Sequence, residues 1–146
     1  MKAEVNKCLE ILRKGGLILY PTDTVWGIGC DATNDDAIRK IFKLKERSDS
    51  KALISIISSY DQLKKLTHVT KEILFEKPTT VIYNNITGIS KLAISPDGTA
   101  AVRIVKDVFC QKLLSRFNKP IISTSANIST QNTPSCFNDI SQKIKD

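Results

Sequence analysis

The sequence has little of several residue types on which familiar enzyme sites depend. Its single histidine, His68, lies in the polar context LTHVT, which favours a surface position over a role as a catalytic base. Catalytic triads that use histidine are therefore excluded. The glycines fit neither GxGxxG nor GxxxxGKS/T, so neither of the standard phosphate-binding loops is present.

Cysteine pairs and long apolar runs are also missing. The four cysteines, at positions 8, 30, 110 and 136, form no CxxC pair and have no histidine at a metal-ligand spacing. We expect them to be reduced, partly buried thiols in a cytoplasmic protein. No apolar run approaches the roughly 18 residues that span a bilayer. Charged residues interrupt the N-terminal segment MKAEVNKCLEILRKGG, so it does not read as a signal peptide.

Positive charge, in contrast, is in excess. The chain has 22 lysines and arginines against 15 acids, for a net charge of +7. This balance favours anionic partners such as nucleic acid, nucleotides or phosphorylated metabolites. A basic surface kept for solubility explains the charge equally well. A hydrophobic content of 41% over 146 residues is ordinary for one globular domain.

Helix and strand patterns alternate along the chain, which predicts an α/β fold with a twisted, mixed sheet flanked by helices. We expect helices over 3–14, 35–45, 61–66 and 107–117, and a weak one over 138–146. We expect strands over 17–20, 27–32, 52–58, 79–84, 100–105 and 120–127.

Two of the predicted strands turn abruptly into polar residues where they end. In LILYPTDTVWG, hydroxyl and carboxylate groups precede Trp26, which suits either a local turn or a small polar pocket with an aromatic wall. In PIISTSANIST, the cluster of Ser123, Thr124, Ser125 and Asn127 suits either an ordinary turn or cap, or neutral donors around phosphate or ribose oxygens. Ligands of α/β sheets usually bind at such strand ends.

The stretch KLKERSDSK, residues 43–51, is rich in cations at the end of a predicted helix. Lysine and arginine are favoured there by the helix dipole, which is the simplest explanation. However, Ser48-Asp49-Ser50 breaks helices. If the helix ends near Lys45, Lys45 and Arg47 point the same way on extended chain and Lys51 returns at the head of the next strand. Such a cluster of cations would suit a phosphate.

Arg103 lies inside the otherwise apolar strand AAVRIV. Burying an arginine among apolar neighbours is unfavourable unless the guanidinium is paired. We therefore expect Arg103 to meet an anion or a carboxylate.

Five ordered blocks together resemble the YrdC-like family of threonylcarbamoyl-adenylate synthases: GGLILYPTDTVWGIGCDA, KLKERSDSKAL, KPTTVIY, AAVRI and KPIISTSANIS. The resemblance covers nearly the whole chain. It implies an open, twisted α/β sheet with a basic concave face. It also implies an enzyme, a nucleotidyltransferase that makes L-threonylcarbamoyladenylate from L-threonine, bicarbonate or CO2, and ATP, releasing pyrophosphate. The product would serve threonylcarbamoyladenosine modification of tRNA by downstream transferase proteins, and Mg²⁺ would accompany ATP.

The same resemblance assigns roles to individual positions. It implies ATP-binding roles for Lys45, Arg47, Lys51, Ser123, Ser125 and Asn127. It implies threonine-binding roles for Thr24, Lys51, Thr80, Arg103 and Ser123. Lys45 and Arg47, which match the family's Lys-x-Arg, are the implied catalytic pair, and no protein ligand for a metal is implied.

Some positions depart from the family pattern. Trp26 stands where tyrosine is usual, and Glu76-Lys77 stands where Pro-Gly is usual. Compared with the family pattern, we expect the segment 52–76 to be short, and we expect the single domain over residues 1–146 to lack the family's C-terminal part, which covers the nucleotide. This absence and the net charge motivate an alternative function, a non-catalytic YrdC-like protein that binds double-stranded RNA or tRNA.

Overall fold

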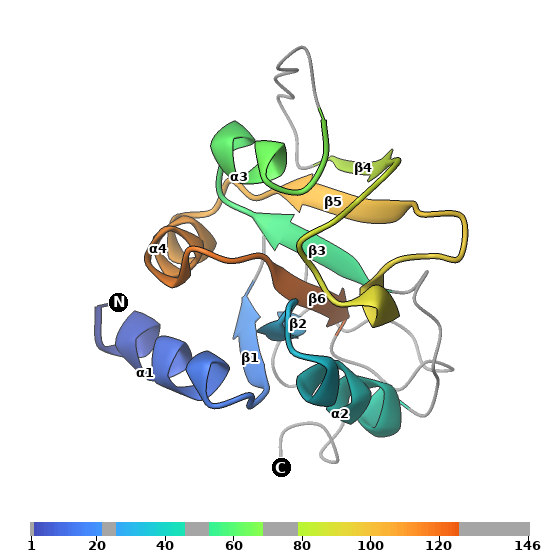
Figure 1. The fold of residues 1–146 in the computed structure, drawn as a ribbon. Coiled ribbons are helices and arrows are strands. Elements are labelled where there is room, and N and C mark those ends of the chain that lie inside the picture. The colour runs from blue at the N-terminus through green and yellow to red at the C-terminus, as the bar shows by residue number, and fades with distance from the viewer. Residues whose placement is uncertain (1, 22–25, 46–52, 69–78, 126–146) are drawn as a thin grey trace.

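The structure is a computed structural model, and it describes residues 2–21, 26–45, 53–68 and 79–125 (Figure 1). Its elements in chain order are α1 (Lys2–Arg13), β1 (Ile18–Pro21), β2 (Trp26–Asp31), α2 (Asp35–Lys45), β3 (Ile54–Ile57), α3 (Tyr60–Lys64), β4 (Thr80–Tyr83), the 3-10 helix η2 (Lys91–Ala93), β5 (Ala100–Ile104), α4 (Val108–Phe117) and β6 (Ile121–Ser125). Within these ranges, no helix is long and apolar enough to cross a membrane.

The strands form one six-stranded sheet in the order β1-β2-β6-β3-β5-β4. β3 and β5 are parallel, and the other neighbouring pairs are antiparallel. The predicted α/β class with a mixed sheet is therefore confirmed. Pro21 continues β1, where we expected it to end the strand, because β1 lies at the edge of the sheet and proline is tolerated on edge strands.

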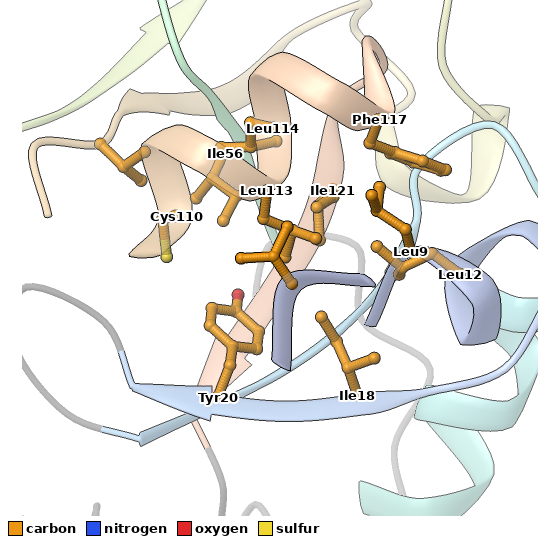
Figure 2. Close-up of a cluster of buried hydrophobic side chains, with 12 residues drawn as sticks. Leu9, Leu12, Ile18, Tyr20, Ile56, Cys110, Leu113, Leu114, Phe117 and Ile121 are labelled. Atoms are coloured by element: carbon orange, nitrogen blue, oxygen red, sulfur yellow. The ribbon is translucent and has the colours of Figure 1, made fainter. Parts of the chain in front are cut away.

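Helices cover both faces of the sheet. On one face, α1 and α4 pack on β1, β3 and β6 around a cluster that includes Leu9, Leu12, Tyr20, Leu113 and Ile121 (Figure 2). On the other face, α2 and η2 pack on β2 and β6, and α3 packs near β5. A fully buried aliphatic side chain contributes roughly 1.5–3 kcal/mol, so these clusters are the main source of stability.

The helices begin and end where local sequence signals place them. Asn34 Oδ1 accepts a hydrogen bond from the Ala37 amide at 3.0 Å, which caps α2 at the start of the helix predicted over 35–45. Asp107 Oδ2 accepts from the Cys110 amide at 2.9 Å and caps α4. Asn118 ends α4 in the left-handed conformation, with φ of 59°. The predicted helix over 138–146 lies outside the described residues.

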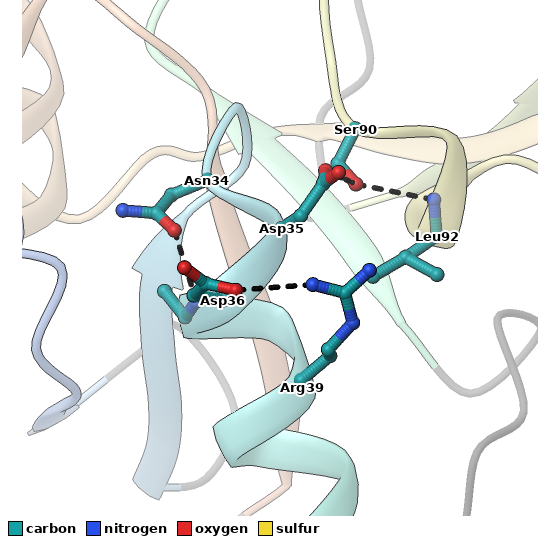
Figure 3. Close-up of polar contacts among 7 residues, drawn as sticks. Asn34, Asp35, Asp36, Arg39, Ser90 and Leu92 are labelled. Carbon is teal, nitrogen blue, oxygen red and sulfur yellow. Dashed lines mark hydrogen bonds and ion pairs between the residues drawn. The ribbon is translucent and has the colours of Figure 1, made fainter.

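The first turn of α2 also carries its acids in structural roles (Figure 3). Ser90 donates its hydroxyl to Asp35 and accepts from the Leu92 amide at 3.1 Å, which joins α2 to η2. Arg39 pairs with Asp36 at 3.0 Å on the surface. Acids are favoured at a helix N-terminus by its dipole, so this cluster needs no ligand to explain it.

Candidate functional site

Several described strand ends meet at one end of the sheet, which we call the Ser125 end. Gly27 near the start of β2 pairs with Ser125 at the end of β6, and Pro21 at the end of β1 pairs with Trp26. Ile54 at the start of β3 pairs with Ser123. In Figure 1 the end of β6 and the starts of β3 and β5 lie on the same side of the sheet. The chain therefore leaves and enters the sheet here next to the PTDT, KLKERSDSK and STSAN segments.

The three segments adjoin the Ser125 end of the sheet in two ways. The PTDT and STSAN segments follow strands that end at the Ser125 end, as expected. The segment 43–51, in contrast, connects the end of α2 with the beginning of β3. Of the predicted site residues, Thr24, Arg47, Lys51 and Asn127 lie outside the described residues.

Lys45 is the last residue of α2, and residues 46–52, which follow it, lie outside the described residues, so the predicted helix end near Lys45 stays a prediction. α2 packs on β2 and the cluster around Ile28, Cys30 and Ile122. The side chain of Lys45 is buried, with 4% of its surface exposed. Whether it converges with Arg47 and Lys51 stays a prediction.

Arg103 and Thr80 form a direct pair on neighbouring strands. They are register partners on β5 and β4, and Arg103 Nε donates to Thr80 Oγ1 at 2.9 Å. Both side chains are half-buried. Among the described residues the partner of Arg103 is thus a neutral hydroxyl, and no carboxylate forms an ion pair with it. A hydroxyl leaves the positive charge uncompensated, so the pair is suited to an anion.

The Arg103–Thr80 pair lies on the face of the sheet that carries α1 and α4. Arg103 pairs with Ile56, and Ile56 pairs with Ile121, which belongs to the cluster under those helices. Ile54, Thr80, Ile82, Ala101 and Arg103 are half-buried or exposed, and we call this region the open part of the face. Ile82 is its most exposed apolar side chain, at 65%.

Ser123 lies at the border between the open part and the region beneath the helices. Ser123 on β6 is the register partner of Ile54 on β3, which is in turn the partner of Ala101 on β5. Arg103 lies two residues further along β5, on the same face of the sheet. Strand spacing of about 4.8 Å and a rise of about 3.3 Å per residue put Ser123 and Arg103 roughly 12 Å apart at Cα. A small ligand can span that distance. Ser125, the last residue of β6, pairs with Gly27.

Tyr20 lies directly next to Ser123 beneath the helices. A Cβ at Gly29, the register partner of Ser123, would lie 2.8 Å from Tyr20 Cε1, so the ring crosses the strand where glycine leaves room. Burial raises the pKa of the Tyr20 phenol well above its ordinary value, while Ser123 lowers it and Cys110 and Asp107 raise it further. Tyr20 belongs to the apolar run LILY, which has no signal of a functional role.

The described cysteines fit the prediction of buried thiols. Cys8, Cys30 and Cys110 are free; Cys8 is half-buried and the other two are buried. Burial, with a contribution from Asp31, raises the pKa of Cys30 to about 12, so this thiol is neutral and unreactive at physiological pH. His68 is exposed, as predicted. Cys136 lies outside the described residues, among which no three His, Cys, Asp or Glu residues form a metal-binding group.

Sequence comparison identifies relatives along most of the chain. The family model Sua5_yciO_yrdC, described as "Telomere recombination", matches residues 10–146. The threonylcarbamoyl-AMP synthase of Psychromonas ingrahamii is 38% identical over 140 residues, which cover 88% of this chain and 72% of the relative. That of Saccharophagus degradans is 35% identical over 131 residues, 85% of this chain and 69% of the relative.

Solved structures share the fold. Sua5 of P. abyssi, in a crystal structure with L-threonine, matches with a TM-score of 0.79 and 28% identity over 92% of this chain and 42% of its own. A doubly substituted form of the same protein, H234A/Y235A, gives a TM-score of 0.84 and 27% identity over 98% of this chain. This chain therefore spans 46% of that Sua5 chain. YciO of E. coli matches with a TM-score of 0.73 and 25% identity over 86% of this chain and 64% of its own.

Proposed function

This chain belongs to the Sua5/YciO/YrdC family, and we propose that it is a threonylcarbamoyl-AMP synthase. The reaction joins L-threonine, bicarbonate or CO2, and ATP into L-threonylcarbamoyladenylate and releases pyrophosphate. Relatives of 34–38% identity that carry this name support the proposal. The structural observation that carries it is the Arg103–Thr80 pair, which lies on the same face of the sheet as Ser123.

The open part of the face suits the threonine side of the reaction. The threonine carboxylate is an anion, and Arg103 offers a charge that its Thr80 partner does not neutralise. Thr80 fixes one edge of the guanidinium through Nε, so the direction of the remaining N–H groups is set before the ligand arrives. We assign Arg103, Thr80, Ser123, Thr24 and Lys51 to threonine.

The Ser125 end of the sheet suits the nucleotide. Lys45 ends α2, and the segment with Arg47 and Lys51 connects it to β3. We assign these three cations, with Ser123, Ser125 and Asn127, to ATP. Lys45 and Arg47 would neutralise charge that develops as the α-phosphate is attacked.

The attack on ATP requires little proton transfer by protein side chains. The carbamate formed from threonine is already an anion, so its oxygen attacks the α-phosphorus without a strong protein base. The bond to the pyrophosphate group breaks as the new P–O bond forms. Mg²⁺, when bound with ATP, would neutralise phosphate charge, with phosphate and water oxygens as its main ligands.

The direct test is threonine-dependent pyrophosphate release. The protein is incubated with ATP and bicarbonate, with and without L-threonine, and pyrophosphate is measured. We expect release only when L-threonine is present, and loss of ATP binding in Lys45→Ala and Arg47→Ala without loss of folding. No threonine-dependent release would overturn the proposal. RNA affinity that falls steeply with salt and is insensitive to ATP and threonine would instead support an RNA-binding function.

For the product, we propose transfer to proteins that modify tRNA. A mixed anhydride of a carbamate and AMP is reactive towards water, so its consumer has to act soon after release. The consumer would be a transferase that carries the threonylcarbamoyl group to an adenosine of tRNA. Added to the assay together with tRNA, such a transferase should convert the product into modified tRNA.

A further inference from the structure

On the face of the sheet that α1 and α4 cover, two buried oxygen atoms have no hydrogen-bond partner among the described residues. They are the phenol oxygen of Tyr20 and Oδ1 of Asp107. Tyr20 as a whole is only 1% exposed. Buried polar atoms in folded proteins nearly always have a partner, so an unsatisfied pair in one region requires an explanation.

Tyr20 Oη lies between the border of the open part and the first turn of α4. The Tyr20 ring crosses Gly29, the register partner of Ser123, which places the ring beside Ser123. Its hydroxyl points towards α4 near Cys110 (Figure 2). Asp107 caps this same turn, with Oδ2 bonded to the Cys110 amide at 2.9 Å. The other carboxylate oxygen, Oδ1, is the unsatisfied one.

The donors and acceptors of these groups suit one order of hydrogen bonds. Neither oxygen has a partner among the described residues as the side chains lie, but a carboxylate oxygen accepts, so Tyr20 would donate its phenol proton to Asp107 Oδ1. The phenol oxygen would then remain an acceptor, and the Ser123 hydroxyl, beside the ring at the register partner of Gly29, is a donor for it. This gives the order Ser123 to Tyr20 to Asp107, which would satisfy both buried oxygens. The influence of Ser123 and Asp107 on the Tyr20 pKa agrees with their proximity.

We propose that Tyr20 is a positioning residue that fixes the direction of the Ser123 hydroxyl. With its proton directed to Tyr20, Ser123 presents lone pairs to the open part of the face. It then accepts from an N–H or O–H group of the ligand, such as an amine or a ribose hydroxyl, and disfavours a phosphate or carboxylate oxygen. This inference rests on the proposed function for the ligand role of Ser123.

Steady-state kinetics of Tyr20→Phe test the positioning role. The substitution removes only the hydroxyl and keeps the ring over Gly29. We expect kcat/KM to fall about three- to tenfold, the effect of one neutral hydrogen bond, mainly through KM for threonine or ATP. Tyr83→Phe is the matched control, because Tyr83 lies on the opposite face of the sheet and should change kcat/KM less than about twofold.

The background of Ser123→Ala separates positioning from a general structural effect. If Tyr20 acts through Ser123, Tyr20→Phe adds less than about a twofold change once Ser123 is alanine, because coupled residues are not additive. The same fold-change in both backgrounds would overturn the proposal. An unchanged kcat/KM in Tyr20→Phe would also overturn it.

Urea unfolding gives a readout that needs no activity. Midpoints are measured for the wild type, Tyr20→Phe, Ser123→Ala and the double variant. We expect the double variant to shift the midpoint by less than the sum of the single shifts, and additive shifts would overturn the hydrogen-bond order. A wild type without threonine-dependent pyrophosphate release would overturn the proposed function, and the unfolding series would still decide whether Tyr20 and Ser123 are bonded.

Discussion

One face of the sheet has a covered part and an open part, and the two differ in what their side chains contact. Beneath α1 and α4, the covered part buries Ile18, Tyr20 and Ile121 in a continuous apolar cluster. On β4 and β5, Ile82 is exposed and the polar pair Thr80–Arg103 is half-buried. Both parts obey the same two-residue alternation, so the alternation does not decide which part is free to bind a ligand. The positions of the helices decide it.

We expect the largest effect from a substitution that destabilises only the covered part. Leu113→Ala on α4 removes a side chain that is 1% exposed from the cluster around Tyr20. We expect the free energy of unfolding to fall by about 2–5 kcal/mol, from lost burial and the cavity left behind. Urea unfolding measures it. Below the unfolding transition, KM for threonine should stay within about twofold of wild type. A loss under about 1 kcal/mol would mean that α4 does not cover the sheet as described.

A smaller effect is expected where the two parts meet. In Gly29→Ala, the new Cβ lies 2.8 Å from Tyr20 Cε1 and 2.9 Å from the Ile122 carbonyl oxygen. The backbone oxygen cannot move away easily, so we expect a loss of about 1–3 kcal/mol, measured by thermal or urea unfolding. Gly98→Ala is a contrasting variant, because its Cβ would meet nothing within 4 Å, although its φ of +85° carries a cost of its own. Equal stability of Gly29→Ala and wild type would show that the ring does not cross this glycine.

Thr80→Val changes the open part without changing its shape greatly. Valine removes the hydroxyl that holds Arg103 Nε at 2.9 Å. We expect kcat/KM for threonine to fall about three- to tenfold, because the guanidinium is no longer oriented, with little change in stability. Pyrophosphate-release kinetics at varied threonine check this. Thr99→Val, which alters a hydroxyl bonded to Asp97 in an exposed turn, is the control and should leave threonine kinetics unchanged.

The smallest effect is expected at the acidic start of α2, far from the open part. Asp36 and Arg39 are 3.0 Å apart with side chains that are 87% and 61% exposed, respectively. We expect Asp36→Asn to lower stability by about 0.5 kcal/mol or less and to leave activity unchanged. Thermal unfolding measures the stability, and pyrophosphate release measures the activity. A large loss of activity would indicate that this polar cluster does more than cap the helix.

Local patterns predicted the elements well, because each depends on nearby residues. The Asn34 cap and the apolar spacing of α2 predicted its helix to within a residue. The short η2 over Lys91–Ala93 was missed, since a single 3-10 turn has no strong periodicity. The predicted strand over 79–84 ran one residue beyond β4 at each end and that over 100–105 one residue beyond β5, whereas β1 and β2 include Pro21 and Trp26, which the prediction left out.

Pairing between distant segments could not be read from the sequence. The strand order places β6 between β2 and β3, and no local pattern indicates this. The family resemblance assigned both Thr80 and Arg103 to threonine, but their direct bond depends on the register of β4 and β5. The contact of Tyr20 with Gly29 and Ser123 similarly requires three strands in register.

Calorimetric titration of L-threonine into the wild type and Arg103→Ala tests most directly that the open part binds the substrate. We expect binding to the wild type and an affinity at least about tenfold lower in Arg103→Ala, because an ionic hydrogen-bond donor is lost. Arg116→Ala is the matched control, an exposed arginine on α4 whose loss should leave the affinity unchanged. If Arg103→Ala bound threonine as tightly as the wild type, the assignment of the open part as the threonine site would be contradicted.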